Sequence, residues 1–142
     1  MIVAIFISPS LTQNVAMPKL LLVEDYESIR DVYFIALTEE GFQVDTASSG
    51  AEALDKTAHS EYDLICLDMV MLGYSGIEFL EAFRVRNPDS KTKVIILSNI
   101  DSPKIVERAK ALAADQYLIK SHYTPKQLTA VIRKELDLTP KA

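Results

Sequence analysis

The sequence contains little cysteine, little glycine and no tryptophan. Among its 142 residues there are one cysteine, four glycines and six prolines. A disulfide within the chain is therefore excluded, and the low glycine and proline content disfavours a disordered or low-complexity chain. The single cysteine, Cys66, lies inside an apolar run, so we interpret it as a small buried residue rather than as a reactive thiol.

Positive charge and long apolar runs are also scarce. The formal net charge is -5 and no basic stripe is present, which argues against direct binding of nucleic acid because such binding depends on Lys and Arg. The apolar run Ile2–Ile7 is far shorter than the roughly 20 residues that cross a bilayer. No Lys or Arg precedes Lys19 to form the charged start of a secretory signal. We therefore expect a cytoplasmic protein without contact with a membrane.

The rest of the composition fits one globular domain. Hydrophobic residues make up 49% of the chain and charged residues 25%, as in ordinary globular proteins. We interpret residues 18–138 as a single domain. Residues 1–17 are interpreted as an N-terminal extension, either an upstream start or a loosely packed segment, and residues 139–142 as a C-terminal tail.

From Pro18 onward, the sequence alternates five times between a short apolar run and a helical pattern. Apolar runs of this length are typical of buried strands, and their alternation with helices predicts a parallel sheet with right-handed connections. The expected fold class is α/β, a doubly wound five-stranded parallel sheet with five helices that cover both faces.

Start and stop signals place the first and last helices. The first is expected from about Ser28 to Glu40, before a stop at Gly41, and a strand is expected over Phe42–Ala47. The buried face of that helix is predicted to hold Ile29, Val32, Tyr33, Ala36 and Leu37. The last helix is expected from about Pro125 to Leu136, with Lys126, Arg133 and Lys134 on its polar face.

Capping patterns mark the starts of the other helices. Ser49-Gly-Ala-Glu52 and Ser75-Gly-Ile-Glu78 have the spacing of capping boxes, in which the serine caps the first turn and the glutamate reaches back. Ser102-Pro103 and Thr124-Pro125 place a capping residue before a proline at the first helical position.

Polar residues end four of the apolar runs. Glu24 and Asp25 follow Lys19–Val23, Asp68 follows Leu64–Leu67, Ser98 follows Lys93–Leu97, and Lys120 follows Tyr117–Ile119. In an open α/β sheet, ligands bind beyond the carboxyl ends of the strands. The sequence therefore predicts one site that collects three carboxylates, a hydroxyl and an ammonium.

This set of side chains suits the transfer of a phosphoryl group. Asp68 is the predicted nucleophile, and a divalent cation would offset the repulsion between its carboxylate and an anionic phosphate. Glu24, Asp25 and Asp68 are the predicted ligands of Mg²⁺, together with a main-chain carbonyl at Met69 or Val70, the latter being preferred. Without the metal, the clustered acids should repel one another and raise the proton affinity of at least one.

Two further side chains are predicted to hold the phosphoryl group. The ammonium of Lys120 can pair with Asp68 before the reaction and with the phosphoryl oxygens after it. Ser98 adds a hydroxyl donor.

The arrangement of Glu24-Asp25, Asp68, Ser98, Tyr117 and Lys120 resembles the receiver domain of bacterial two-component response regulators, in particular its stand-alone, chemotaxis-regulator-like members. The segments KLLLVEDYES and DLICLDMVMLGYSG also look like this family, and the resemblance extends from Lys19 to about Leu136. It implies a flavodoxin-like sheet with the strand order 2-1-3-4-5.

The resemblance also implies a function. Asp68 would accept a phosphoryl group from a sensor histidine kinase or phosphotransfer protein with Mg²⁺, and the phosphate would then be hydrolysed; the chain would catalyse only these reactions on itself. Ser98 would move toward the phosphoryl group and Tyr117 would turn inward, changing the face formed by the fourth helix, fifth strand and fifth helix. That face would bind a downstream protein or a second copy of the chain. No helix-turn-helix or P-loop pattern is present. We therefore expect the chain to pass on its signal by binding to another protein.

Four positions depart from the usual family pattern. Leu72 and Ser121 stand where proline is common, Asn99 replaces a small residue, and Ala113 replaces a glycine. In the family, the peptide bond between the lysine and the proline that follows it is often cis. Ser121 replaces that proline here, so the sequence leaves either a trans or a strained cis bond open at Lys120–Ser121.

Three rival functions have different sequence requirements. A phosphohydrolase would want a second acid two residues after Asp68, where Val70 stands. A flavin-binding electron carrier would want a phosphate-binding loop after Leu20–Val23, and none is present. A receiver-like scaffold that binds partners without phosphorylation remains as the alternative.

Overall fold

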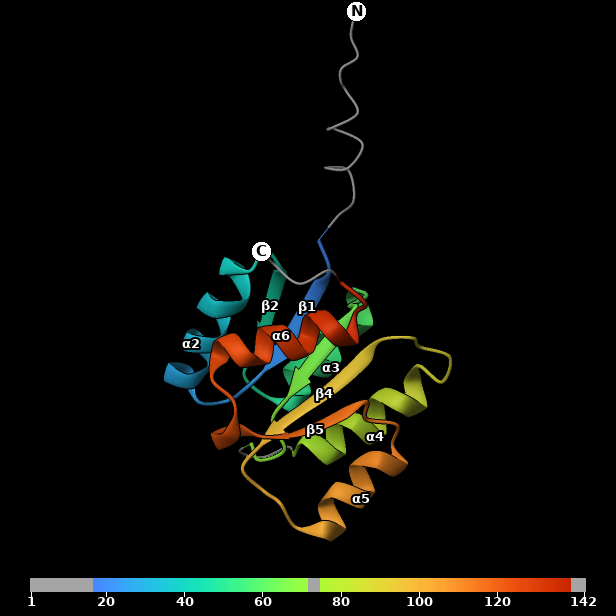
Figure 1. Cartoon of the computed structure of the whole chain (residues 1–142). Helices are drawn as coiled ribbons and strands as arrows, with labels where there is room; N and C mark the ends of the chain where they lie inside the picture. Colours follow the sequence, from blue (N-terminus) through green and yellow to red (C-terminus); the bar gives the residue numbers. More distant parts are fainter. Residues whose placement is uncertain (1–16, 72–74, 139–142) are drawn as a thin grey trace, which may run out of the picture.

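The computed structural model describes residues 17–71 and 75–138. Its strands are β1 (Lys19–Val23), β2 (Gln43–Ala47), β3 (Leu64–Leu67), β4 (Lys93–Ser98) and β5 (Gln116–Ile119). They form one sheet in the order β2-β1-β3-β4-β5, and each neighbouring pair is parallel (Figure 1). The predicted five-stranded parallel sheet and its 2-1-3-4-5 order are confirmed. The domain limits stay a prediction, because residues 1–16 and 139–142 lie outside the described part.

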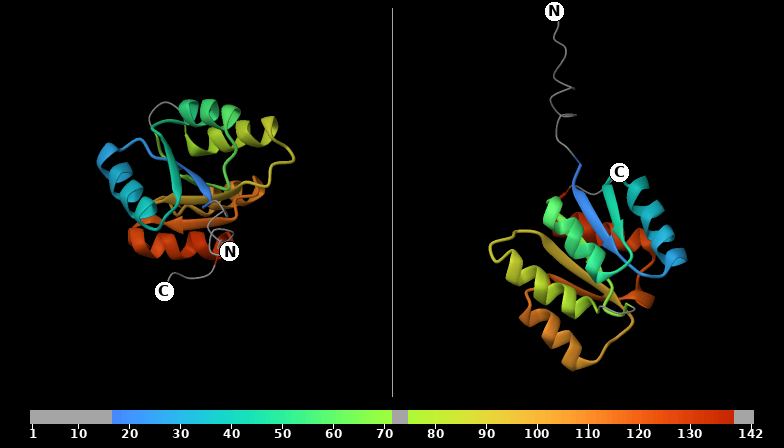
Figure 2. Two further views of the ribbon diagram at one scale, coloured as in Figure 1. Left: turned by 90° about the horizontal axis from the view of Figure 1, so that it is seen from above. Right: turned by 180° about the vertical axis from the view of Figure 1, so that it is seen from behind.

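Helices cover both faces of the sheet. They are α2 (Glu27–Glu39), α3 (Gly50–His59), α4 (Gly76–Arg86), α5 (Pro103–Ala111) and α6 (Pro125–Glu135), and a short 3₁₀ turn, η1 (Lys120–His122), precedes α6. Helices α2 and α6 lie together on one face, while α3 and α4 lie side by side on the other with α5 beyond them (Figure 2). The predicted doubly wound arrangement with five helices is therefore confirmed for the described residues.

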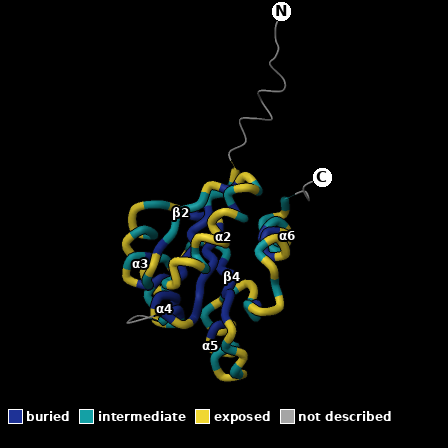
Figure 3. The backbone as a smooth tube through the Cα atoms, turned by 90° about the vertical axis from the view of Figure 1, so that its left-hand side faces the viewer, coloured by how far each residue is buried: buried dark blue, intermediate teal, exposed yellow. Residues whose placement is uncertain are grey.

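Each face of the sheet has its own apolar core. Successive side chains of a strand point to opposite faces, so Leu21 and Val23 pack toward α3, α4 and α5 while Leu20 and Leu22 pack toward α2 and α6. The three inner strands are buried along almost their whole length, as the tube in Figure 3 shows for β4. Cys66 lies in the core between the sheet and helices α2 and α6, where burial raises the pKa of its thiol to about 12. This agrees with the prediction that Cys66 is buried and unreactive.

The first helix, α2, differs from its prediction slightly in its bounds and in the exposure of one residue, Val32. It runs one residue earlier at each end than expected, and β2 begins at Gln43. Tyr33 and Leu37 are buried as predicted, but Val32 is 53% exposed. The main contacts of the helix are with β1, β2 and α6, and Val32 lies outside the side of the helix that they cover. Gly41 has a φ of 99° and ends the helix, as predicted.

The polar face predicted for the last helix also needs a correction. Arg133 does not extend into solvent but reaches across to the end of α2. Its Nε lies 3.1 Å from an Oε of Glu40, and its guanidinium lies over the ring of Phe42. A long arginine side chain can cover an apolar ring and still pair its charge, which a helical wheel drawn from the sequence does not reveal.

Two of the predicted helix caps are confirmed in full, one is confirmed in part and one is absent. Ser75 with Glu78, and Thr124 with Gln127, form complete capping boxes. The Ser49 oxygen accepts from the N–H of Glu52, but the Glu52 carboxylate binds Ser48 instead of reaching back to Ser49. Ser102 makes no capping bond, and only Pro103 marks the start of α5.

The turn after α5 contains a residue in an unfavourable backbone conformation. Ala113 has a φ of 65°, which lies in the left-handed region that costs an L-residue about 1–2 kcal/mol. The N–H groups of Ala113 and Ala114 close the helix end on the carbonyls of Lys110 and Ala109, a pattern that usually has glycine at this place. The departure noted in the sequence therefore has a structural cost.

We expect Ala113→Gly to stabilise the protein by about 1 kcal/mol, since relief of the left-handed strain outweighs the added freedom of glycine in the unfolded chain. Thermal or urea unfolding measures the gain. The control is Ala111→Gly, at the exposed end of α5, which should lose about 0.5–1 kcal/mol. A loss of stability in both variants would contradict the proposed strain at Ala113.

Candidate functional site

The predicted site residues meet at the carboxyl edge of the sheet. Because β1 and β3 are neighbouring parallel strands, with Val23 paired to Leu67, the residues that follow them come out side by side. The N–H groups of Glu24 and Asp68 continue the ladder by donating to main-chain carbonyls of the neighbouring segments. The described part of the chain enters β1 at the opposite end of the sheet (Figure 1).

Three carboxylates form the centre of this site. Oxygens of Glu24, Asp25 and Asp68 all lie within 4.8 Å of one another. Glu24 is 3% exposed and Asp68 is 8% exposed, so their charges are poorly solvated. A set of hard oxygen donors at this spacing fits a divalent cation such as Mg²⁺. The structure thus brings together the three acids that the sequence predicted to cluster.

Lys120 bridges two of the three acids. Its Nζ lies 2.8 Å from Oε1 of Glu24 and 3.4 Å from Oδ2 of Asp68. The sequence predicted a pair with Asp68; the structure brings Lys120 to both carboxylates and nearer to Glu24. Burial alone lowers the pKa of Lys120, but its bonds to the two acids outweigh this and the pKa is raised. The ammonium is therefore fully charged at neutral pH.

The pKa of Glu24 is raised, as predicted for at least one of the clustered acids, but burial contributes more than repulsion between the acids. Burial raises the pKa of its carboxyl above the ordinary 4.5 and the charge of Asp68 raises it further, while the hydrogen bond from Lys120 counteracts the shift. The net direction is upward. A proton and a cation would thus compete for this carboxylate.

Ser98 and Tyr117 both contact the loop that follows β4. Ser98 is the last residue of β4 and is 1% exposed, and its Oγ accepts from the N–H of Ile100 at 3.2 Å. The Tyr117 hydroxyl donates to the carbonyl oxygen of Ile100 at 2.6 Å, and its ring packs against the core that α3, α4 and α5 cover. Burial raises the pKa of Tyr117, and its contact with Ser98 partly offsets this.

The segment after Asp68 contains a close approach that the sequence analysis did not use. The carbonyl of Met69 accepts from the N–H of Gly76, and the N–H of Val70 donates to Oδ1 of Asp68. A Cβ atom on Gly76 would lie 2.3 Å from the carbonyl oxygen of Asp68. The Val70 carbonyl stays a prediction as the main-chain ligand of the metal. Leu72 lies outside the described residues.

Arg30 is a second residue that the sequence analysis missed. It lies on α2, and its Nη1 donates to the main-chain carbonyls of Glu24 and Asp25 at 2.9 and 3.4 Å. It therefore fixes the backbone that carries the two acids. A single arginine one turn into an amphipathic helix gives no sequence signal for such a contact, because surface arginines are common there.

The Lys120–Ser121 peptide bond is trans, so the question that the sequence left open is resolved. The N–H of Ser121 donates to Oδ1 of Asn99 at 3.0 Å. Two of the positions that depart from the usual family pattern are thus hydrogen-bonded to each other across 22 residues of sequence.

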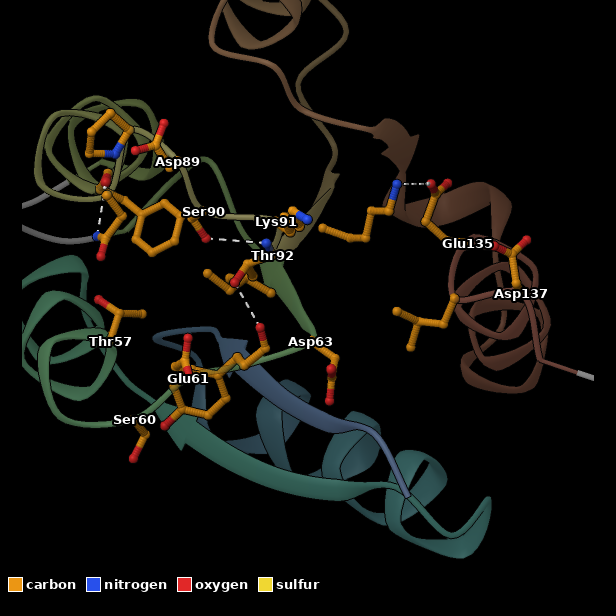
Figure 4. A pocket seen from close by; sticks show the side chains of 17 residues that line it. Thr57, Ser60, Glu61, Asp63, Asp89, Ser90, Lys91, Thr92, Glu135 and Asp137 are labelled. Carbon is orange, nitrogen blue, oxygen red and sulfur yellow. Dashed lines mark hydrogen bonds and ion pairs between the residues drawn. The ribbon is translucent and has the colours of Figure 1, made fainter. Parts of the chain in front are cut away.

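A separate polar cavity of about 780 Å³ lies near the amino ends of β3 and β4 (Figure 4). It is formed by the loops before these strands and by the end of α6, with Glu61, Asp63, Lys91 and Glu135 among its walls. None of the predicted site residues borders it. The chemistry of the carboxyl edge therefore does not extend to this cavity.

The chain is similar to known proteins of one family. The family model for the response regulator receiver domain matches residues 20–133. The uncharacterized transcriptional regulatory protein YkoG of Bacillus subtilis is 37% identical over 117 residues, which are 82% of this chain and 50% of YkoG. The chain spans about half the length of the curated relatives it matches, as with PhoB of Rhizobium meliloti, of which 51% is covered.

Two solved structures show the same arrangement of strands and helices. The chemotaxis protein CheY4 of Vibrio cholerae has a TM-score of 0.78 at 33% identity, with 84% of this chain and 98% of CheY4 covered. The response regulator TrrA of Thermotoga maritima, solved in complex with Mg²⁺ and BeF, has a TM-score of 0.73 at 35% identity, with 84% of this chain and 99% of TrrA covered.

Proposed function

The chain belongs to the response regulator receiver family of two-component systems, and from this premise we propose that Asp68 accepts a phosphoryl group and so acts as a signalling switch. One observation carries the proposal: the Asp68 carboxylate lies beside two other acids, and the Lys120 ammonium lies 3.4 Å from it. The acids supply metal ligands, and the ammonium supplies the charge that a phosphoryl group requires.

The proposed donor is a phosphohistidine on a sensor histidine kinase or a phosphotransfer protein. An Asp68 oxygen attacks the phosphorus, the P–O bond of an acyl phosphate forms, and the P–N bond to the imidazole breaks. The imidazole leaves as the neutral base after it gains a proton. Attack of water on the phosphorus later returns the free carboxylate and inorganic phosphate, so the chain catalyses only these reactions on itself.

Glu24, Asp25 and Asp68, with the Val70 main-chain carbonyl, are the proposed ligands of Mg²⁺. When bound, the ion offsets the repulsion between the carboxylates and an incoming phosphate. The three acids fit this role because their oxygens lie together, while Lys120 pairs with Glu24 and Asp68. The complex of TrrA with Mg²⁺ and BeF supports the same choice of ion.

Ser98, Lys120 and Tyr117 are proposed to sense the phosphoryl group. Lys120 and the Ser98 hydroxyl would bind its oxygens, and Tyr117 would report the change because its hydroxyl holds the Ile100 carbonyl in the loop after Ser98. The affected surface is formed by α5, β5 and α6. We propose that this surface binds a downstream protein or a second copy of the chain, while a cytoplasmic location and the lack of nucleic acid binding stay predictions.

We expect the affinity for Mg²⁺ to fall as the pH is lowered from neutral to about pH 5, a range over which an unperturbed glutamate stays mostly ionised. The pKa of Glu24 is raised, so protonation begins at a higher pH than usual and removes one anionic ligand as the pH falls. Thermal-shift titrations with Mg²⁺ at the two pH values measure this. Glu24→Gln should bind more weakly at both and show less pH dependence. Equal affinity of the unaltered protein at the two values would contradict the role of Glu24.

The direct test of the proposed function is the intact mass of the protein after incubation with acetyl phosphate and Mg²⁺. The gain of one phosphoryl group, prevented by a chelator, is the expected result. If no phosphoryl group is gained and beryllofluoride also fails to bind, the scaffold that acts without phosphorylation becomes the better account.

A further inference from the structure

The carboxyl ends of β4 and β5 are joined beyond the last backbone pair of the sheet. The ladder between these strands ends at Ser98 and Ile119. Asn99 is the first residue after β4, and its side chain accepts a hydrogen bond from the N–H of Ser121 at 3.0 Å. The amide oxygen of Asn99 thus stands where a main-chain carbonyl would otherwise continue the ladder.

This contact places an anchor on each side of Lys120. Ile119 is held by the ladder to β4, and Ser121 is held by Asn99. The main chain of Lys120 lies between them, and its carbonyl accepts from the N–H of Tyr123. A lysine side chain has a long and flexible stem, so the position of its ammonium depends on how firmly its backbone is fixed.

The contact requires a particular chemistry at both positions. Ser121 can donate only because it has a backbone N–H, which a proline would lack. Asn99 can accept only because its side chain carries a carbonyl oxygen, which alanine and glycine lack. The loop that contains Asn99 is held a second time by the bond from Tyr117 to Ile100 at 2.6 Å, so the anchor for Ser121 is itself tied to β5.

We infer that Asn99 is a positioning residue, whose side chain clamps the Ser121 backbone and thereby holds the Lys120 ammonium against Asp68 and Glu24 in the conformation that accepts a phosphoryl group. The inference rests on the proposed function of Asp68. Asn99 and Ser121 are both exposed. The inference assigns to them control over the rate at which Asp68 is phosphorylated.

The experiment measures two quantities for each variant. The first is the rate of phosphorylation by acetyl phosphate with Mg²⁺, followed by intact mass. The second is the hydrogen exchange of the Ser121 amide in the unphosphorylated protein, followed by NMR. Asn99→Ala should slow phosphorylation and speed exchange of that amide, each by about two- to tenfold, the range expected for the loss of one ordinary hydrogen bond.

Double variants show whether Asn99 acts through this bond. In a Ser121→Ala background, which keeps the N–H, Asn99→Ala should still slow phosphorylation. In a Ser121→Pro background, which removes the N–H, Asn99→Ala should have no further effect. Slowing of equal size in both backgrounds would overturn the inference. His122→Ala, in the same turn and exposed, is the control for general disturbance of η1.

Failure of this inference and failure of the proposed function give different results. If the unaltered protein gains no phosphoryl group, the proposed function of Asp68 fails, and the clamp as a device for phosphorylation fails with it. If the unaltered protein is phosphorylated and Asn99→Ala leaves both the rate and the amide exchange unchanged, only the clamp is overturned. If Ser121→Pro does not fold, the phosphorylation rate and the amide exchange of Asn99→Ala still decide whether the clamp exists.

Discussion

Asp68→Asn is expected to abolish the gain of a phosphoryl group from acetyl phosphate and Mg²⁺. The amide that replaces the carboxylate is a far weaker nucleophile and removes one anionic metal ligand. Intact mass after incubation should show the phosphorylated species in the unaltered protein and none in the variant. The effect is a complete loss rather than a slowing, because Asp68 is the proposed attacking group.

The loss in Asp68→Asn should not come from unfolding. The charge of Asp68 helps to raise the pKa of Glu24, so its removal relieves repulsion, and Lys120 keeps Glu24 as a partner at 2.8 Å. We therefore expect an unfolding temperature equal to or above that of the unaltered protein. Asp101→Asn, which makes the same change in the exposed loop after Ser98, is the matched control and should be phosphorylated normally. Phosphorylation of Asp68→Asn would move the acceptor to another residue.

Gly76→Ala is expected to have the largest effect on stability. A Cβ atom at this position would lie 2.3 Å from the Asp68 carbonyl oxygen and 2.8 Å from the Cα of Met69. Both contacts are with backbone, so no side chain can rotate to make room. Overpacking of this kind costs about 3 kcal/mol, which corresponds to an unfolding temperature lowered by about 10 °C.

Gly76→Ala should also impair phosphorylation. The backbone that must move carries Asp68, and a misplacement of about 1 Å in a reacting group can slow a reaction by roughly a hundredfold. We expect at least about a tenfold lower rate with acetyl phosphate, measured at a temperature at which the variant is still folded. The control is Val85→Ala in the same helix, where the side chain is 81% exposed and the change should alter neither quantity appreciably. Unchanged stability of Gly76→Ala would contradict the close approach.

The sheet and the acid cluster were predictable because they depend on local patterns. Buried parallel strands appear as apolar runs, and a polar residue directly after such a run must lie at the carboxyl edge. This rule sufficed to bring Glu24, Asp25 and Asp68 together with Lys120. It did not reveal that Lys120 lies nearer to Glu24, since both carboxylates are within reach of a flexible ammonium.

Features that depend on contacts between distant segments could not be predicted. Val32 has the spacing of a buried residue, yet the edge position of α2 leaves it exposed. Arg133 has the spacing of a solvated residue, yet it binds Glu40. The bond from Ser121 to Asn99 joins residues 22 positions apart, and the sequence showed only that each differs from the usual pattern.

The burial of Cys66 has a practical consequence for following this protein in solution. It is the only cysteine of the chain, and with 2% exposure and a pKa of about 12 its thiol remains protonated and shielded from alkylating reagents. A cysteine introduced on the surface, for example by Val85→Cys, would then be the sole site of attachment for a fluorophore or spin label. The native chain thus offers an unreactive background for labels on introduced cysteines, without prior removal of its own thiol.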